Sequence, residues 1–457
     1  MAGFNGKQTV KIGIVIFLIT IALRFVAFYS PAINWDETIY ALVGNGWVHG
    51  HPPYTTVWDN KPPFLYALFA VFEMLIPDPV IAIRTLGVLA ATTAAILVWK
   101  IAKHRGASSH SAFFGGLAFA IGSASNGGLA TNAELLMVVF TSAAILAAIS
   151  ERPFYSGLSF GAAIFIKQVA VFESLAILYA IFINRPPFLK TFFLLAVGGL
   201  IVPLLLISYL AWSSDLYGFW QEVVVDNLTR VSGHFDWRAL IITGAYQPCW
   251  TMLYASLFLL RDRVVWLWLL GGILGVISGK YFYPHYFIQI LPALCIAFAL
   301  SLDRLFETRR VAVLCAFVFL LPTFASGAYK LLSVLRAPGN ERMIAKKIPS
   351  GASLYVFNAQ PVLYLLTQSK PPTPYVLPTI LTGNLFYNVA QVNPLHEIDR
   401  IFQNNPDFVV TGSWSTSGPL QPQSDENPAA YQLAQNWLRA DYSEFAIFPD
   451  AVVWRHN

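Results

Sequence analysis

The chain has 457 residues, of which 56% are hydrophobic and only 12% are charged, and its mean hydropathy is +0.58. These values exclude an ordinary soluble globular protein and indicate many membrane-spanning helices. The formal net charge of +5 is modest and its basic residues fall in short loops, so no nucleic-acid partner is indicated. Cys249, Cys295 and Cys315 lie in apolar stretches without disulfide or zinc-type spacing, and we expect them to serve packing.

Apolar runs and their flanking Lys and Arg clusters predict a chain with a cytoplasmic N-terminus and eleven spans. The first run lacks a clear cleavage site, so we expect it to stay as the first span. A single bent helix over 154–183 is an alternative, but it would place all later positive clusters outside, which favours two spans joined near Lys167. The predicted spans are residues 12–29, 80–101, 111–129, 134–150, 154–168, 169–183, 191–212, 241–260, 264–278, 284–301 and 311–329.

Three further segments complete the predicted architecture. Residues 62–76 are apolar but too short to span, which predicts a helix lying at the membrane surface, and residues 35–48 form a second candidate. Gly271, Gly275 and Gly279 recur at every fourth position, a pattern that allows close helix packing. We therefore predict a polytopic α-helical membrane domain over residues 1–330.

Polar composition returns after about residue 331, and no later segment is long enough to cross a membrane. We predict a C-terminal α/β domain over residues 331–457, on the outer side. Within it we expect strands at Ala352–Asn358 and Asp407–Thr411 and helices at Pro361–Thr367 and Pro428–Arg439.

The adjacent acids Asp36 and Glu37 follow the first span at the outer membrane boundary. Ionisable residues in this position indicate a functional site, the alternative being a solvated pair in a loop. Other polar residues fall on the same predicted face: Tyr40, His49, His51, Tyr54, Trp58, Asp59, Asn60, Lys61, Asn132, Glu134, Lys167, Gln168, Lys280, Tyr281, Tyr283, His285 and Tyr286.

Carboxylates and lysines at a lipid boundary suit the displacement of a phosphate from a membrane-anchored donor. A carboxylate can accept the proton of an attacking hydroxyl, and cations stabilise charge on the departing phosphate. Lys167 is costly near an apolar helix end, which favours a partner such as a phosphate; a snorkelling lysine is the alternative.

In the order of these motifs the chain resembles the bacterial GT-C glycosyltransferases, the membrane enzymes related to protein O-mannosyltransferases and to the aminoarabinose transferase of lipid A. The resemblance covers about residues 10–330. It rests on Asp36-Glu37, Asn60-Lys61-Pro62-Pro63, Asn132-Ala133-Glu134, Lys167-Gln168 and Tyr283-Pro284-His285-Tyr286.

The resemblance implies an inverting transfer of a sugar from a polyprenyl phosphate to a hydroxyl of a lipid, glycan or protein, at the outer face of a bacterial inner membrane. Asp36 would be the general base, with Glu37 either orienting the acceptor or sharing that role, and Glu134 would be the second acid, placing the acceptor or the sugar. Lys61, Lys167, His285 and Tyr283 would bind the lipid phosphate. The expected substrate-binding residues are Tyr40, Tyr54, Trp58, Asn60, Asn132 and Gln168.

The sequence leaves open the roles of two arginines and the presence of a metal site. Arg24 and Arg84 lie at the outer ends of the first two spans, where they either pair with these acids or anchor at the interface. His49, His51 and Asp59 could hold a divalent metal, but their spacing favours structural roles, and no cofactor is expected. The absence of a Gly-rich nucleotide fingerprint fits a lipid-linked donor.

Two other functions compete with an enzyme. A transporter or flippase could bind an anionic lipid with the same charges, but such proteins often have inverted repeats and charges near the midplane, and neither pattern is evident. A non-catalytic scaffold for the C-terminal domain would leave the grouped acids and lysines unexplained. The sugar, the acceptor and the oligomeric state are not readable from the sequence.

Overall fold

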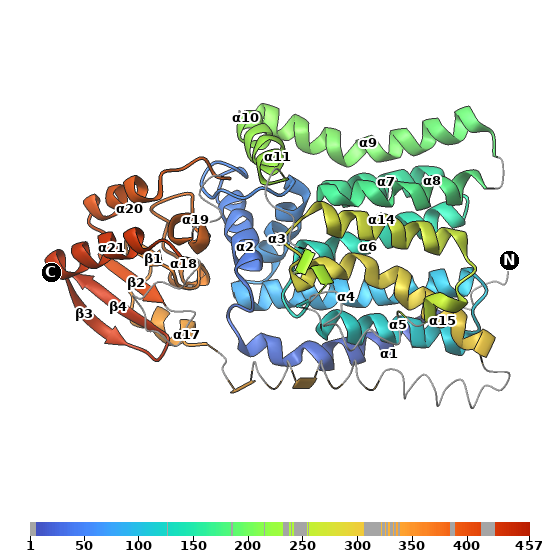
Figure 1. Ribbon diagram of the computed structural model, residues 1–457, viewed down its shortest axis with the longest axis horizontal. Coiled ribbons are helices and arrows are strands. Elements are labelled where there is room, and N and C mark those ends of the chain that lie inside the picture. Colours follow the sequence, from blue (N-terminus) through green and yellow to red (C-terminus); the bar gives the residue numbers. More distant parts are fainter. Residues whose placement is uncertain are drawn as a thin grey trace.

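The computed structural model describes residues 6–457 except 126, 184–185, 214, 232–236, 239, 242–253, 255, 306–320, 322–324, 326–327, 330–331, 333–334, 337–338, 384–388 and 413–425. In Figure 1, the long helices run side by side, and the C-terminal sheet lies beyond one end of this bundle. Helix α1 begins toward the opposite end. The first span therefore begins at the end of the bundle opposite the C-terminal sheet.

The membrane part is built almost entirely of helices. In chain order, they are α1 (Gly6–Arg24), η1 (Phe25–Tyr29), α2 (Trp35–Val48), α3 (Pro63–Leu75), α4 (Pro79–His104), α5 (Ser109–Ser125), α6 (Ala133–Ile149), α7 (Pro153–Ile164), η2 (Gln168–Glu173), α8 (Ser174–Phe182), α9 (Phe188–Trp212), α10 (Leu216–Phe219), η3 (Trp220–Val225), α11 (Asp226–Val231), η5 (Ser256–Leu259), α14 (Arg263–Ser278), η6 (Pro284–Ile290) and α15 (Leu291–Leu305). Most of the η segments are 3₁₀-helical, whereas η3 is a π-helix.

Four of the described helical segments are long and apolar enough to cross a membrane: Thr9–Tyr29, Pro79–His104, Phe188–Trp212 and Pro284–Arg304. Three of the shorter apolar helices coincide with predicted spans: Ala133–Ile149, Gln168–Phe182 and Arg263–Ser278. The predicted spans 241–260 and 311–329 lie mostly outside the described residues, as do Cys249 and Cys315, whereas Cys295 is buried as expected. The polytopic helical fold is confirmed; the number of spans stays a prediction.

Both predicted surface helices are present at the end of the bundle that faces the C-terminal sheet (Figure 1). The side chain of Asn34 caps α2 by accepting a hydrogen bond from the backbone N–H of Asp36 at 2.6 Å. Helix α3 begins at Pro63, where the missing N–H of proline costs nothing. The rings of Tyr40 and Phe69 meet edge to face, 5.7 Å apart, and join the two helices.

The chain reverses direction at Lys167, as predicted. Helix α7 runs back along α6, since the Ser156 hydroxyl donates to the Ala144 carbonyl near the far end of α6. Lys167 then lies beside Glu134, at the start of α6. The segment that follows, η2 and α8, is therefore a separate helical segment and does not continue α7 as one bent helix.

The C-terminal part contains a four-stranded sheet in the order β1-β2-β4-β3. Strand β1 pairs in parallel with β2, and β4 pairs antiparallel with both β2 and β3. The elements are α17 (Glu341–Ala345), β1 (Leu354–Phe357), α18 (Val362–Thr367), α19 (Pro378–Thr382), α20 (Pro394–Gln403), β2 (Phe408–Gly412), α21 (Pro428–Asp441), β3 (Tyr442–Ile447) and β4 (Ala451–His456).

The C-terminal part contacts the membrane part through α18, which packs against α2. The backbone N–H of Trp58 also donates to the carbonyl of Pro374 at 2.9 Å. The predicted α/β character and both predicted strands are confirmed. The sheet therefore lies at the end of the bundle that carries Asp36.

Candidate active site

The start of α2 is fixed by a buried carboxylate. The Glu37 side chain is fully buried and accepts three hydrogen bonds, from Arg84 Nη1 at 2.5 Å, the Thr131 backbone N–H at 2.7 Å and the Ile33 backbone N–H at 2.8 Å. Such charge-assisted bonds are strong, and here they join three segments that are distant in sequence. Of the two interpretations of Arg84, pairing with an acid or anchoring at the interface, the structure confirms the first. Glu37 is thus enclosed by protein atoms and holds α2 against the rest of the bundle.

Asp36, next to Glu37, points to a more open environment. Its side chain is 35% exposed, and its Oδ2 lies 3.6 Å from Nε2 of His285, which is 11% exposed. His285 is on η6, and its ring stacks on Tyr283 with the centroids 5.8 Å apart. The predicted proximity of the first outer loop to the loop before η6 is therefore present in the structure. Asp36 is the acid of the pair that a second molecule can reach.

Lys167 and Glu134 form a second acid–base pair. Glu134 is in the first turn of α6 and is almost fully buried, and Lys167 precedes η2 in extended backbone. Lys167 Nζ donates to Glu134 Oε1 and lies 4.1 Å from the centre of the Tyr286 ring. The ammonium group is thus held by a carboxylate and an aromatic face rather than extended to the interface.

Lys61 approaches from the segment between α2 and α3. Its Nζ donates to Asn60 Oδ1 at 2.6 Å and lies 3.4 Å from Asp59 Oδ1. It also lies 5.8 Å from the centre of the Tyr40 ring. These contacts aim the ammonium group toward the middle of the candidate site.

Tyr40 lies in the centre of these groups. Its side chain is only 2% exposed, and burial raises the pKa of Tyr40 well above its ordinary value. The negative charges of Asp36, Asp59 and Glu134 raise this pKa further, so all three carboxylates act on one phenol. Tyr40 therefore keeps its proton and can serve as a hydrogen-bond donor.

Other predicted site residues lie in the framework around these groups. The Tyr54 hydroxyl donates to the Lys61 carbonyl at 2.8 Å. The fully buried Asn132 directly precedes α6, and its side chain donates to the Gly127 carbonyl at 3.2 Å. The Asn132 amide oxygen is buried with no partner among the described residues. Gln168 is half-buried at the start of η2.

Three further residues have partners within the protein. Trp58 donates through Nε1 to Asp226 Oδ2 at 3.0 Å and so joins two of the outer segments. Arg24 binds the Gly128 carbonyl and the Ser123 hydroxyl instead of an acid. The His49 ring lies with Nδ1 at 2.8 Å from the Asn45 carbonyl oxygen of α2. In the described part of the chain, no three His, Cys, Asp or Glu side chains are grouped as metal ligands.

Sequence reasoning missed Glu222 and Asp226. Glu222 accepts a hydrogen bond from the Asp59 backbone N–H at 3.0 Å, and burial raises its pKa to about 9. Burial also raises the pKa of Asp226, which accepts from Trp58 and from Gln391 of the C-terminal part. Their i,i+4 spacing in a predicted outer loop was the available signal. It could not show which segment they would meet.

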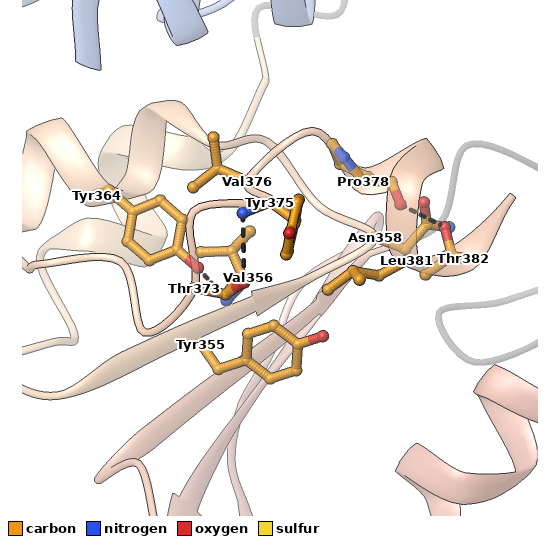
Figure 2. A pocket seen from close by; sticks show the side chains of 10 residues that line it. All are labelled: Tyr355, Val356, Asn358, Tyr364, Thr373, Tyr375, Val376, Pro378, Leu381 and Thr382. Carbon is orange, nitrogen blue, oxygen red and sulfur yellow. Dashed lines mark hydrogen bonds between the residues drawn. The ribbon is translucent and has the colours of Figure 1, made fainter. Parts of the chain in front are cut away.

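Figure 2 shows a pocket in the C-terminal part, beside β1. Its lining combines tyrosine and threonine hydroxyl groups with aliphatic side chains and contains no lysine or acid. This pocket is therefore distinct from the convergent charged residues. The lining residues are Tyr355, Val356, Asn358, Tyr364, Thr373, Tyr375, Val376, Pro378, Leu381 and Thr382.

Comparison with known proteins agrees with this fold. Residues 60–212 match the family model of dolichyl-phosphate-mannose-protein mannosyltransferases. The chain is similar to ArnT from Cupriavidus metallidurans bound to undecaprenyl phosphate, with a TM-score of 0.70, 14% identity and coverage of 98% of this chain and 97% of that chain. For ArnT from the same organism in the apo state, the TM-score is 0.67 and the sequence identity is 15%, with coverage of 96% of this chain and 97% of that chain. Curated protein sequences give no significant match.

The fold is that of the GT-C glycosyltransferases, because the similarity to ArnT extends over both the helical bundle and the C-terminal part. Together with the family match to residues 60–212, this shared fold supports a multi-pass membrane protein related to the glycosyltransferases. The matched segment runs from Asn60 to the end of α9 and includes Lys61, Glu134 and Lys167.

Proposed function

We propose that the enzyme transfers a sugar from a polyprenyl phosphate to a hydroxyl group of a lipid, glycan or protein acceptor. The reaction would take place at the outer face of a bacterial inner membrane, where the candidate site and the C-terminal part meet. The fold shared with ArnT, whose structure contains undecaprenyl phosphate, supports a carrier lipid of this kind. The carboxylates and lysines at one end of the bundle support chemistry at a lipid phosphate.

The observation that carries this proposal is the placement of Asp36. It is a partly exposed carboxylate, 3.6 Å from His285, within a group of residues that includes two lysines. Asp36 would accept the proton of the acceptor hydroxyl group while the oxygen of that hydroxyl group attacks the anomeric carbon of the sugar. The bond from this carbon to the phosphate oxygen breaks, and the phosphate leaves with the electron pair. A single displacement of this kind inverts the anomeric centre.

The lysines would stabilise the departing phosphate. Lys61 and Lys167 approach the site from different segments, so their charges can bind two sides of one phosphate group. Glu134 keeps the ammonium group of Lys167 in place. His285 and Tyr283 would line the phosphate site, and Tyr40 can donate a hydrogen bond to the sugar or the phosphate.

The remaining predicted residues would support this geometry. Glu37 is enclosed by Arg84 and two backbone N–H groups, so we assign it to positioning Asp36 instead of accepting a proton. The amide oxygen of Asn132 is available to a ligand group or a water molecule that reaches it. Tyr54 and Asn60 hold the segment that carries Lys61.

The first prediction concerns Asp36→Asn, which keeps the shape of the side chain and removes the base. We expect the transfer rate to fall by about 10²–10⁴-fold, the usual contribution of a general base. The full-length variant would be compared with the wild type by mass spectrometry of membrane lipids and envelope glycans in a strain lacking the gene. Undecaprenyl phosphate binding to the purified protein should persist.

The matched control is Glu151→Gln, which removes an exposed acid from the turn between α6 and α7, at the far end of the bundle. This variant should restore the same sugar-modified product as the wild type. If Asp36→Asn restores it equally well, Asp36 is not the base. If deletion of the gene changes only the leaflet in which an unmodified precursor accumulates, the protein moves lipids and the transferase proposal fails.

A further inference from the structure

A carboxyl group that the proposed reaction does not use lies inside the helical bundle. Glu173, the last residue of η2, is completely buried in an apolar segment. Its Oε2 accepts a hydrogen bond from Trp268 Nε1 at 2.6 Å, and its Oε1 accepts one from Gln289 Nε2 at 2.9 Å. An acid in such surroundings is costly, and its retention indicates a function.

These bonds join the two short helices that carry site residues. Glu173 ends η2, which begins directly after Lys167, and Gln289 is on η6, four residues after His285. Gln289 Nε2 also approaches the Val169 carbonyl of η2 at 3.4 Å. The contacts of Gln289 with Glu173 and Val169 therefore set the spacing between the Lys167 turn and the His285 turn.

Helix α14 forms the surface on which both short helices rest. A Cβ atom on Gly271 would overlap the Phe172 carbonyl, and one on Gly275 would lie 2.5 Å from the Gln289 amide. A Cβ on Gly279 would lie 2.9 Å from the Tyr286 ring. The predicted glycine pattern thus permits close contact between helical segments, here with η2 and η6.

We propose that Glu173 is a positioning residue that, through Gln289, holds Lys167 at the correct distance from His285 for binding the carrier phosphate. This inference rests on the proposed function, because it assigns Lys167 to that phosphate. Removing the tie would let η2 and η6 shift separately, and displacements of about 1 Å can cost about 10²-fold in activity.

Glu173→Leu and Gln289→Leu each remove the hydrogen bond between the Glu173 and Gln289 side chains. For both variants we expect undecaprenyl phosphate to bind at least about tenfold more weakly, equivalent to about 1.4 kcal/mol. The measurement is the Kd of undecaprenyl phosphate for full-length protein in nanodiscs. Trp268→Phe is the matched control, because it removes one bond to Glu173 and keeps the tie to Gln289; its Kd should stay within about threefold of the wild-type value.

The exchange variant Glu173→Gln/Gln289→Glu separates positioning from general damage to the fold. Its new amide can donate to the new carboxylate, so the tie is restored with the same net composition. We expect its Kd to return to the wild-type range. If the single variants melt at lower temperature but their folded fraction binds undecaprenyl phosphate as the wild type does, the role is only structural and the inference is wrong.

A second measurement needs no ligand. Hydrogen exchange should rise in residues 165–175 when Gln289 is replaced and in residues 283–290 when Glu173 is replaced, because each residue stabilises the other segment. If each substitution affects only its own segment, the tie does not exist. If the wild-type protein fails to bind undecaprenyl phosphate, the proposed donor is wrong. The hydrogen-exchange measurement still decides whether Glu173 and Gln289 stabilise each other's segments.

Discussion

At the scale of single residues, Arg84 and Glu37 form a pair from which solvent is excluded; their side chains are 1% and 0% exposed. We predict that Arg84→Met strongly destabilises the protein, because it leaves the buried Glu37 carboxyl group without its partner. Breaking a buried pair in this way costs about 3–5 kcal/mol. The measurement is the thermal unfolding midpoint of the detergent-solubilised protein.

The double variant Arg84→Met/Glu37→Gln is the control for this prediction. It removes the stranded charge, so much of the lost stability should return. The Gln side chain can still accept from the Thr131 backbone N–H, which keeps part of the local geometry. An equal loss in the single and double variants would show that the charge of Glu37 is not the cause.

At the scale of elements, α9 depends on close contact with α7. Cβ atoms added to Gly157 or Gly161 of α7, or to Gly198 of α9, would each overlap a carbonyl oxygen of the facing helix. Neither backbone can give way without moving the helix. We predict that Gly161→Leu separates α7 from α9. Its free energy of unfolding should fall by at least the ~1–3 kcal/mol typical of overpacking, which lowers the unfolding midpoint by several degrees.

Gly199→Ala is the matched control for this contact. An added Cβ at this position would lie 3.6 Å from the Gly157 carbonyl oxygen, an ordinary van der Waals distance. The midpoint of this variant should therefore remain close to that of the wild type. Similar losses for Gly161→Leu and Gly199→Ala would mean that close helix packing is not what holds α9.

At the scale of the whole molecule, Glu222 and Asp226 join the outer segments to the C-terminal part. Glu222 accepts from the Asp59 backbone N–H, and Asp226 accepts from Trp58 and Gln391. Trp58 in turn donates through its backbone to Pro374. Through Asp226, this cluster of acids adds to the contact that α18 and α2 make between the C-terminal part and the bundle.

This cluster predicts a pH-dependent stability. Burial first, and then Asp59, Asp226 and Asp215, raise the pKa of Glu222 from 4.5 to about 9. Between these values the folded state binds more protons than the unfolded state, so the free energy of unfolding falls as pH rises. The stabilisation is fully present below pH 4.5 and is lost as pH rises through about 9.

The measurement is the unfolding midpoint at pH 6 and at pH 9 for the wild type and for Glu222→Gln. The amide of this variant cannot ionise but still offers an oxygen to the Asp59 N–H. The difference between the two pH values should therefore be smaller in Glu222→Gln. Equal differences would show that another group titrates in this range.

Local patterns made much of the architecture predictable. The apolar segments, the surface helix beginning at Pro63, the strands β1 and β2 and the reversal at Lys167 each follow from residues close together in the chain. The grouping of Asp36, Lys61, Glu134, Lys167 and His285 at one end also followed, because alternating spans place every second loop on the same face. The sequence by itself thus determined the fold class and placed these five residues at one end of the bundle.

Only the tertiary structure decided which of these charges meet. Glu37 pairs with Arg84 and Glu134 with Lys167, although the sequence placed both acids equally near the site. The roles of Glu222 and Glu173 were likewise decided by segments more than a hundred residues away. Buried polar groups take the partners that packing brings within hydrogen-bond distance, and packing depends on contacts between distant segments that local periodicity does not encode.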